Sequence, residues 1–304
     1  MRVLFAGDVI SGRLILEEIK NLGVLAAIAI ADRDRKNLPS IGIPIVDINK
    51  INEKSIIDEI KTWNIDLLVN FNSSIIFSND LLACLTIGGI NFHPGILPQY
   101  AGSNTHQWTM LNNEYYSGVT IHVINQGVDA GPVLSCSKVK ILAEDTGFTL
   151  FIKLVRLGSE LITQLLPKIL KQGFDFSMPQ DPSKRNFFLK NRKIDGKINF
   201  NQKASYVHRF IQALNYRPAI SPLGHSFIDA PLCIIEPIRV SVSKVSPALL
   251  SMPGTILEID SECMSIACMD KSIQIKKFWF ENKLIDAVDG AAVSGMRPGQ
   301  VLES

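Results

Sequence analysis

Three polar side chains near the middle of the chain have the types and spacing that acyl transfer to an amine requires. Asn91 and His93 are two residues apart, so on an extended segment their side chains point to the same side. Asp129 follows in a turn-prone stretch, from which its carboxylate can orient the His93 ring and stabilise its protonated form. The amide would stabilise a tetrahedral oxyanion, while the imidazole would move protons from the attacking nitrogen to the leaving group. We therefore predict a catalytic site composed of Asn91, His93 and Asp129.

Buried strands are expected to position these groups. The apolar run 87–90 precedes Asn91 and stops at Pro94, which is typical of a strand that carries polar side chains at its carboxyl end. A second strand is predicted at 118–124. His122 on this strand is expected to be a hydrogen-bonded histidine in the core or just behind the site, and not a catalytic residue. Apolar strands alternate with helical patterns before this region, which indicates a doubly wound, mostly parallel α/β sheet. The expected strands are 2–5, 24–30, 45–48 and 65–70, and the expected helices are 11–21, 54–63 and 81–85.

The composition changes after a long amphipathic helix predicted at 149–171. Six basic and two acidic residues fall between 181 and 200, which indicates either a solvated linker or a contact with a phosphorylated acceptor. Short alternating strands with turn signals follow and predict a small antiparallel β-barrel, similar to an OB fold. We therefore predict a catalytic domain at 1–180, a basic linker at 181–203 and a barrel domain at 204–304.

Composition excludes several classes of protein. The chain is 46% hydrophobic and 20% charged with a formal net charge of +2, as expected of an ordinary globular protein. No apolar run is long enough to span a membrane, and the first residues lack the features of a signal peptide, so we expect a cytoplasmic protein. Five cysteines without C-x-x-C spacing are expected to be free thiols, and no metal-binding motif is visible.

The motif residues as a set resemble those of the 10-formyltetrahydrofolate-dependent formyltransferases. The pattern reads N-x-H-P-x-x-L-P-x-Y from Asn91 to Tyr100, followed by G-V-T-I-H and then D-x-G. The residues that match are Asn91, His93, Pro94, Leu97, Pro98, Thr120, His122, Asp129 and Gly131. The barrel and its linker resemble those of the family members that act on methionyl-tRNA.

The resemblance implies a folate cosubstrate, 10-formyltetrahydrofolate, held in an apolar pocket through backbone groups. The residues it assigns to this pocket are Ser74, Ile75, Ile76, Phe77, Leu82, Gln126, Gly127 and Val128. It also implies that the amine acceptor enters beside Tyr100, Ser103 and Asn104. His106 belongs to the same group as a possible substitute for a missing basic residue, although its position favours a surface residue at the start of a helix.

The acceptor itself stays open between methionyl-tRNA and a small amine such as an amino-sugar nucleotide. Family members that act on tRNA or sugars commonly carry an arginine after the motif tyrosine, where this chain has Ala101. Residues 201–304 hold ten Lys and Arg against ten Asp and Glu, a net charge of zero, whereas an RNA-binding surface should be basic. Two alternatives remain: a formyltetrahydrofolate hydrolase, and a non-catalytic folate-binding protein on the same scaffold.

Overall fold

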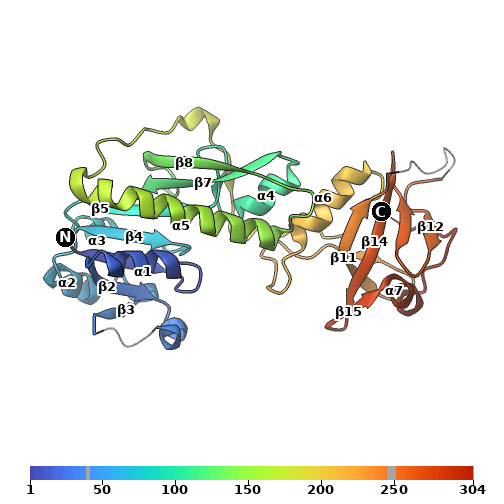
Figure 1. Cartoon of the computed structure of the whole chain (residues 1–304), viewed down its shortest axis with the longest axis horizontal. Coiled ribbons are helices and arrows are strands. Elements are labelled where there is room, and N and C mark those ends of the chain that lie inside the picture. Colours follow the sequence, from blue (N-terminus) through green and yellow to red (C-terminus); the bar gives the residue numbers. More distant parts are fainter. Residues whose placement is uncertain (39–41, 245–250, 304) are drawn as a thin grey trace. The chain divides into compact units, whose positions relative to one another are not determined.

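The computed structural model describes residues 1–38, 42–244 and 251–303, which form two compact units (Figure 1). The first unit comprises residues 1–105, 117–139 and 151–189, and the second comprises 106–116, 140–150 and 190–304. Each unit therefore combines stretches that are separate in sequence. The division into 1–180, 181–203 and 204–304 stays a prediction.

A seven-stranded sheet with the order β3-β2-β1-β4-β5-β7-β8 is the centre of the first unit. Its strands are β1 (Val3–Gly7), β2 (Leu25–Ile30), β3 (Ile45–Asp47), β4 (Leu67–Phe71), β5 (Gly88–His93), β7 (Tyr116–Val123) and β8 (Val133–Lys140). The pairs from β3 to β5 are all parallel, and β7 runs antiparallel to β5. This arrangement confirms the predicted doubly wound, mostly parallel sheet.

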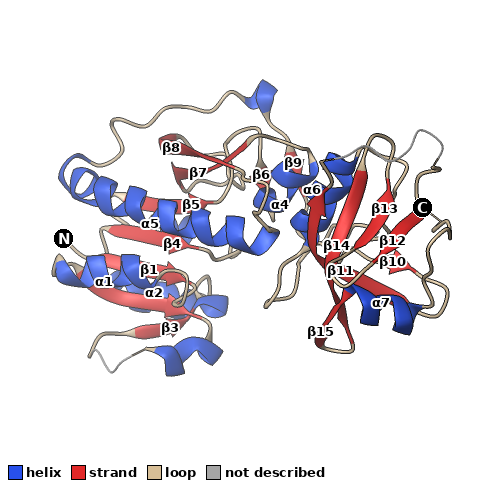
Figure 2. Cartoon of the chain, turned by 45° about the vertical axis from the view of Figure 1, so that its right-hand side comes forward, coloured by secondary structure: helices blue, strands red, loops and turns tan. Residues whose placement is uncertain are grey.

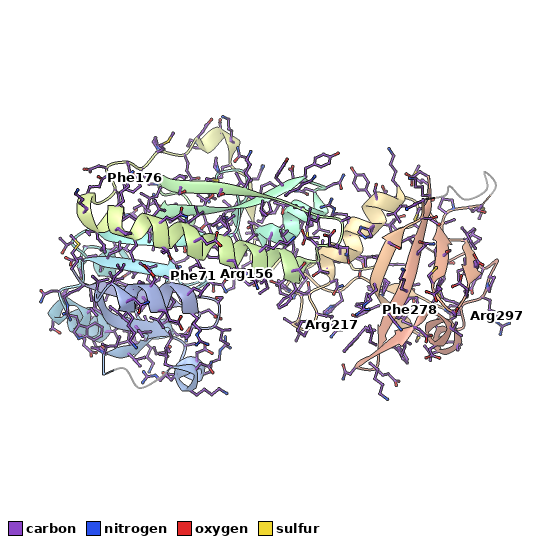
Figure 3. The ribbon with its side chains drawn as sticks, in the orientation of Figure 1. Phe71, Arg156, Phe176, Arg217, Phe278 and Arg297 are labelled. Carbon is purple, nitrogen blue, oxygen red and sulfur yellow. The ribbon has the colours of Figure 1, made fainter. Side chains whose placement is uncertain are left out.

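Helices cover both faces of this sheet because its strands are apolar on both sides. The helices are α1 (Arg13–Asn21), α2 (Lys54–Thr62), α3 (Asn79–Leu82) and the part of α5 (Gly147–Gln172) from residue 151 onward. Helix α4 (Thr105–Leu111) belongs to the second unit except for Thr105. On one face Leu4 of β1 and Ile57 of α2 belong to the same buried cluster. On the other, Phe71 stacks on Phe92 with ring centroids 4.3 Å apart. A Cβ at Gly158 would lie 2.1 Å from the Phe92 ring, so this glycine lets α5 approach the sheet. Figures 2 and 3 show the course of α5 along the sheet.

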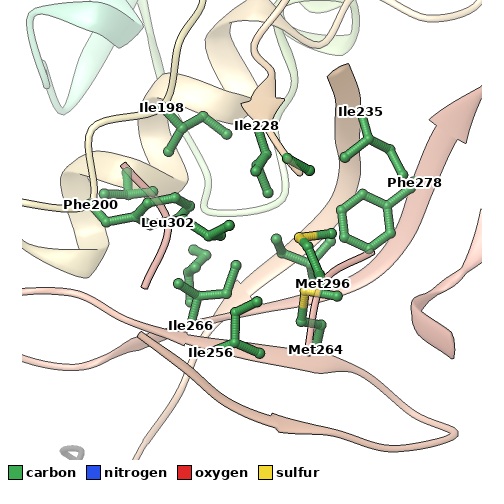
Figure 4. Close-up of a cluster of buried hydrophobic side chains, with 14 of the residues drawn as sticks. Ile198, Phe200, Ile228, Ile235, Ile256, Met264, Ile266, Phe278, Met296 and Leu302 are labelled. Carbon is green, nitrogen blue, oxygen red and sulfur yellow. The ribbon is translucent and has the colours of Figure 1, made fainter. Parts of the chain in front are cut away.

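An antiparallel, half-barrel sheet forms the second unit, with the order β10-β11-β14-β13-β12 and β15 paired to β14. Its strands are β10 (Ile228–Asp229), β11 (Ile234–Val242), β12 (Ile256–Ile259), β13 (Met264–Ala267), β14 (Ser272–Phe280) and β15 (Lys283–Asp286). Two helices, α6 (Ala204–Leu214) and α7 (Ala287–Ser294), contribute to its core. The core side chains converge between the strands and these helices (Figure 4). The predicted small antiparallel barrel is confirmed.

Phe278 is one of two fully buried phenylalanines in this second core, and its truncation provides a test of the packing. The side chain is fully buried, and a Cβ at Gly290 of α7 would lie 2.4 Å from its ring. We expect Phe278→Ala to lower the free energy of unfolding by about 3–5 kcal/mol, because the cavity cannot close fully. Leu284→Ala, at a side chain that is 45% exposed on β15, should cost about 1 kcal/mol or less. Urea unfolding followed by circular dichroism measures both, and equal losses would contradict this description of the core.

Candidate active site

A row of three polar side chains crosses the carboxyl end of the first sheet. Asn70 of β4 is in register with Asn91 of β5, and Asn91 is in register with His122 of β7. Directly paired residues point to the same face of a sheet, so the three side chains lie side by side. The Asn70 Nδ2 donates to Asn91 Oδ1 at 2.7 Å, and Asn91 Nδ2 lies 3.0 Å from His122 Nε2. Strand register, more than any local motif, therefore fixes the Asn91 amide.

The hydrogen bonds of this row determine which way the Asn91 amide faces. The Nδ1 atom of His122 lies 2.9 Å from the carbonyl oxygen of Val123, which only accepts, so Nδ1 carries the hydrogen. The Nε2 atom is then the acceptor for one hydrogen of the Asn91 Nδ2 group. These contacts leave the second Nδ2 hydrogen of Asn91 as a donor with a fixed direction.

His93 is the last residue of β5, and only 3% of it is exposed. Its Nε2 donates to the carbonyl oxygen of Tyr100 at 2.6 Å, and its Nδ1 lies 3.5 Å from Asp129 Oδ1. Burial lowers the pKa of His93, and this effect outweighs the opposing attraction of the Asp129 carboxylate. The ring is therefore neutral near pH 7, with the lone pair on Nδ1 facing Asp129.

Asp129 lies in the loop after β7 and stays ionised although it is largely buried. Burial by itself would raise its pKa, but the imidazoles of His93 and His122 and the backbone N–H of Gly102 lower it to about 2. The His122 Nε2 lies 3.4 Å from Asp129 Oδ1, and the Gly102 N–H donates to Oδ2 at 2.8 Å. The carboxylate is thus a fixed negative charge between two imidazoles.

A segment that follows α5 holds the Asp129 backbone from outside the sheet. Gln180 Nε2 donates to the carbonyl oxygens of Asp129 and Gly131 at 2.9 and 2.7 Å. Arg185 donates to the carbonyl oxygens of Val128 and Asp129 at 2.6 and 3.2 Å. Asp129 has a φ of +50°, in the left-handed region, so these four bonds stabilise a loop conformation that a residue with a Cβ adopts at a cost.

The same segment also reaches the loop that follows the histidine. Strand β9 (Phe187–Phe188) pairs in parallel with β6 (Ala101–Gly102) in a separate two-stranded sheet. The Phe188 ring stacks on Tyr100 with centroids 5.4 Å apart. Residues 180–188, which we call the strap, therefore contact both the backbone that accepts from His93 and the backbone that carries Asp129.

The structure brings together Asn91, His93 and Asp129, and it adds contacts from four further side chains. His122 is part of the G-V-T-I-H motif, and its burial agrees with the expected place in the core or just behind the site. Asn70 ends a predicted strand. Gln180 and Arg185 lie 51 and 56 residues after Asp129, and no local pattern connects them to it.

Seven of the eight residues expected to bind the cosubstrate fall in two irregular stretches of the first unit, and Leu82 lies on α3. Residues 74–77 connect β4 to α3; Phe77 is buried in the core, whereas the side chain of Ile76 is 64% exposed. The Ile76 carbonyl accepts from Asn52 Nδ2 at 2.8 Å, which ties this stretch to the unit. The second stretch, Gln126–Val128, precedes Asp129, and Val128 is 41% exposed. Leu82 at the end of α3 packs against the core.

The four residues expected beside the acceptor are divided between the units. Tyr100, Ser103 and Asn104 belong to the first, and the Ser103 N–H donates to the Phe188 carbonyl at 2.9 Å. His106 belongs to the second unit and is only 3% exposed, so its interpretation as a surface residue is wrong. Its Nε2 lies 3.2 Å from the Tyr216 hydroxyl, and burial lowers its pKa to about 3. His106 is therefore neutral and does not supply a positive charge.

Two further observations concern the described part of the chain as a whole. Across residues 1–38, 42–244 and 251–303, no group of three or more His, Cys, Asp and Glu side chains is arranged to hold a metal ion. In the same ranges, no helix combines the length and the apolar character needed to cross a membrane.

Comparisons with known proteins agree on one family. A sequence model of the formyl transferase family matches residues 26–166, and one of the formyl transferase C-terminal domain matches residues 190–289. A methionyl-tRNA formyltransferase of Lachnospira eligens is 28% identical over 244 residues, which are 80% of this chain and 76% of that protein. The bifunctional polymyxin resistance protein ArnA of Wigglesworthia glossinidia brevipalpis is 31% identical over 234 residues, 77% of this chain and 34% of ArnA.

Solved structures give the same fold at lower sequence identity. The crystal structure of WlaRD, a sugar 3N-formyl transferase in the presence of dTDP and 5-N-formyl-THF, aligns with a TM-score of 0.69. The alignment covers 90% of this chain and 97% of WlaRD at 18% identity, so it supports the fold alone.

The contact of the strap with Asp129 can be tested through the amide of Gly102, which donates to the Asp129 carboxylate. We expect Arg185→Met to speed hydrogen exchange of this amide by about tenfold, because two hydrogen bonds that hold the loop are lost. Lys184→Met is the matched control, since its side chain is 63% exposed and pairs only locally with Asp181. Exchange measured by NMR at the same rate in both variants would show that Arg185 does not hold Asp129.

Proposed function

The chain belongs to the formyl transferase family, and we propose that it transfers a formyl group from 10-formyltetrahydrofolate to a primary amine through Asn91, His93 and Asp129. The observation that carries the proposal is the convergence of an oriented amide, a neutral imidazole and an ionised carboxylate within one unit. These are the groups that acyl transfer to nitrogen requires.

In the proposed reaction the amine nitrogen bonds to the formyl carbon, the bond from that carbon to the folate nitrogen breaks, and a proton passes from amine to folate nitrogen. The second Nδ2 hydrogen of Asn91 would donate to the oxygen as it gains negative charge, because His122 and Asn70 hold the amide in place. Such preorganised donors act most strongly where water is excluded, and Asn70 and His122 are both buried.

His93 is the proposed proton carrier. Its Nε2 hydrogen is held by the Tyr100 carbonyl, so Nδ1 is the atom that would receive a proton. The resulting imidazolium would lie 3.5 Å from the Asp129 carboxylate, which would stabilise the new charge. The ring would become neutral again when it passes the proton to the folate nitrogen. Asp129 would also keep the ring in a single orientation.

The residues of the two irregular stretches fit a flat heteroaromatic cosubstrate. Residues 74–77 and 126–128 lie outside helices and strands, so their backbone N–H and C=O groups are outside the regular ladders. Ile76 and Val128 expose apolar side chains there, which would contact the ring faces. The cosubstrate would supply the activated formyl group, and WlaRD has been crystallised with a formylated tetrahydrofolate.

The acceptor is proposed as a primary amine, either that of methionyl-tRNA or that of a small molecule such as an amino-sugar nucleotide. The Lachnospira eligens relative supports the first, because it is a methionyl-tRNA formyltransferase that aligns over most of its length. The zero net charge of residues 201–304, the lack of an arginine after Tyr100 and the neutrality of His106 favour the second. Tyr100, Ser103 and Asn104 remain the residues proposed to contact the acceptor.

The decisive experiment measures tetrahydrofolate release from 10-formyltetrahydrofolate with initiator methionyl-tRNA and, separately, with a panel of amino-sugar nucleotides. Saturable turnover with either acceptor, together with a formylated product, supports the proposal and selects the acceptor. Release of tetrahydrofolate at the same rate without any amine would replace the proposal with a hydrolase. Binding of folate with no turnover under any condition would replace it with a folate-binding protein.

Substitution of the three proposed catalytic residues should remove activity without unfolding the chain. We expect Asn91→Ala, His93→Ala and Asp129→Asn each to lower kcat by about 10²–10⁴-fold, because each removes a group that acts on the reacting atoms or on the charged ring. Asp175→Asn, at an exposed carboxylate of the same unit, should retain full activity. Near-normal turnover in Asp129→Asn, with unchanged circular dichroism, would overturn the assignment.

The pH dependence of kcat/KM should report the His93 ring. Because burial lowers the pKa of His93, the neutral form persists below the ordinary value of 6.5, and activity should fall only at a pH below that value. The Asp129 carboxylate raises the same pKa, so the residual activity of Asp129→Asn should fall at a still lower pH than that of the wild type. Rate profiles measured from pH 4.5 to 9 test this, and a midpoint that moves upward in the variant would contradict it.

A further inference from the structure

A pocket of about 140 Å³ in the second unit is not used by the proposed reaction. Its walls come from the exposed side of α6, the stretch 197–202 that precedes this helix, and Leu111 at the end of α4. Ile198 and Val207 are almost fully buried and connect the pocket to the core of this unit. None of the lining residues belongs to the proposed catalytic or folate-binding sets.

The pocket has apolar walls and positively charged edges. Leu111, Phe210 and the ring of Tyr206 provide carbon surface, and Tyr206 is 47% exposed. Lys197 and Arg209 are the charged lining residues, and no Asp or Glu is among the residues that line the pocket. An occupant that combines a ring with a negative charge fits this combination of walls.

Arg209 is the charged residue that α6 contributes to the pocket. Burial lowers the pKa of Arg209, although Asp145 and Tyr115 attract the guanidinium. A partly buried guanidinium beside apolar side chains is a strong partner for an anionic oxygen.

The size of the pocket limits the occupant to a single ring. A cavity of about 150 Å³ is known to accommodate benzene. We infer that this pocket binds a small organic anion with one ring and one carboxylate, with the ring between Tyr206 and Phe210 and the carboxylate on Arg209. This binding site shares no residue with the proposed formyl-transfer site, and the inference does not depend on the proposed function.

Benzoate is the probe, with benzamide as the neutral analogue and acetate as the anion without a ring. Titration of the full chain, followed by the methyl NMR signals of Ile198 and Leu111 and by calorimetry, should give saturable benzoate binding with a Kd of about 1 mM or lower. Benzamide and acetate should each bind at least about tenfold more weakly, because each lacks one of the two contacts.

Arg209→Gln should weaken benzoate binding at least about tenfold, because the charged partner of the carboxylate is lost. Lys203→Gln is the control for general attraction, since this exposed cation flanks the same helix outside the pocket, and it should leave binding unchanged. Tyr206→Ala changes an exposed side chain, so it should fold normally and still weaken benzoate binding. If Arg209→Gln fails to fold, Tyr206→Ala alone tests whether benzoate binds in this pocket.

Three results would overturn the inference. One is the absence of saturation by benzoate below about 10 mM, well above the affinity expected for a ring that fills the pocket. Another is equal weakening by Arg209→Gln and Lys203→Gln, which would reduce the effect to overall charge. The third is equal affinity for benzoate and benzamide, which would exclude recognition of the carboxylate.

Discussion

A carboxylate that is removed from water must be surrounded by donors or positive charge, and Asp129 is the group on which this requirement falls. The Gly102 N–H donates to this carboxylate, and the His93 and His122 rings lie 3.5 and 3.4 Å away, where a proton gained by either ring would be stabilised. These groups lower the pKa of Asp129 to about 2. The same contacts fix the imidazole rings, one at the end of β5 and one on β7. Most of the polar geometry of the site therefore follows from keeping one buried charge ionised.

The two imidazoles around this carboxylate have different hydrogen-bond partners and so different capacities. His122 has its Nδ1 hydrogen on a backbone carbonyl and its Nε2 on the Asn91 amide, so both nitrogens are engaged within the sheet. His93 has only Nε2 engaged in this way, and its Nδ1 faces Asp129. A proton carrier needs a nitrogen that is free to change its protonation state, which is why His93 rather than His122 suits that role.

The strap shows how a distant part of the chain can stabilise an unfavourable loop. Asp129 occupies the left-handed region, and Gln180 and Arg185 bind the carbonyl groups around it. Both are side-chain donors to backbone acceptors, so they hold the loop without competing for the carboxylate. The cost of the strained backbone is offset within the same unit by these contacts.

The parallel sheet, the small antiparallel barrel and the three polar groups can be predicted without the structure, because strand patterns and a short motif are local properties of the chain. The side chains of Asn91 and His93 point to the same side of the strand because the two residues are two positions apart. That Asn70 and His122 flank Asn91 is known only from the folded chain, because strand register depends on pairing between residues 21 and 31 positions apart. The folded chain also shows that His106 is buried and neutral and that Gln180 and Arg185 bind the backbone at Asp129. The contacts of Gln180 and Arg185 depend on the path of the chain after the long helix α5, and no local sequence pattern predicts that path.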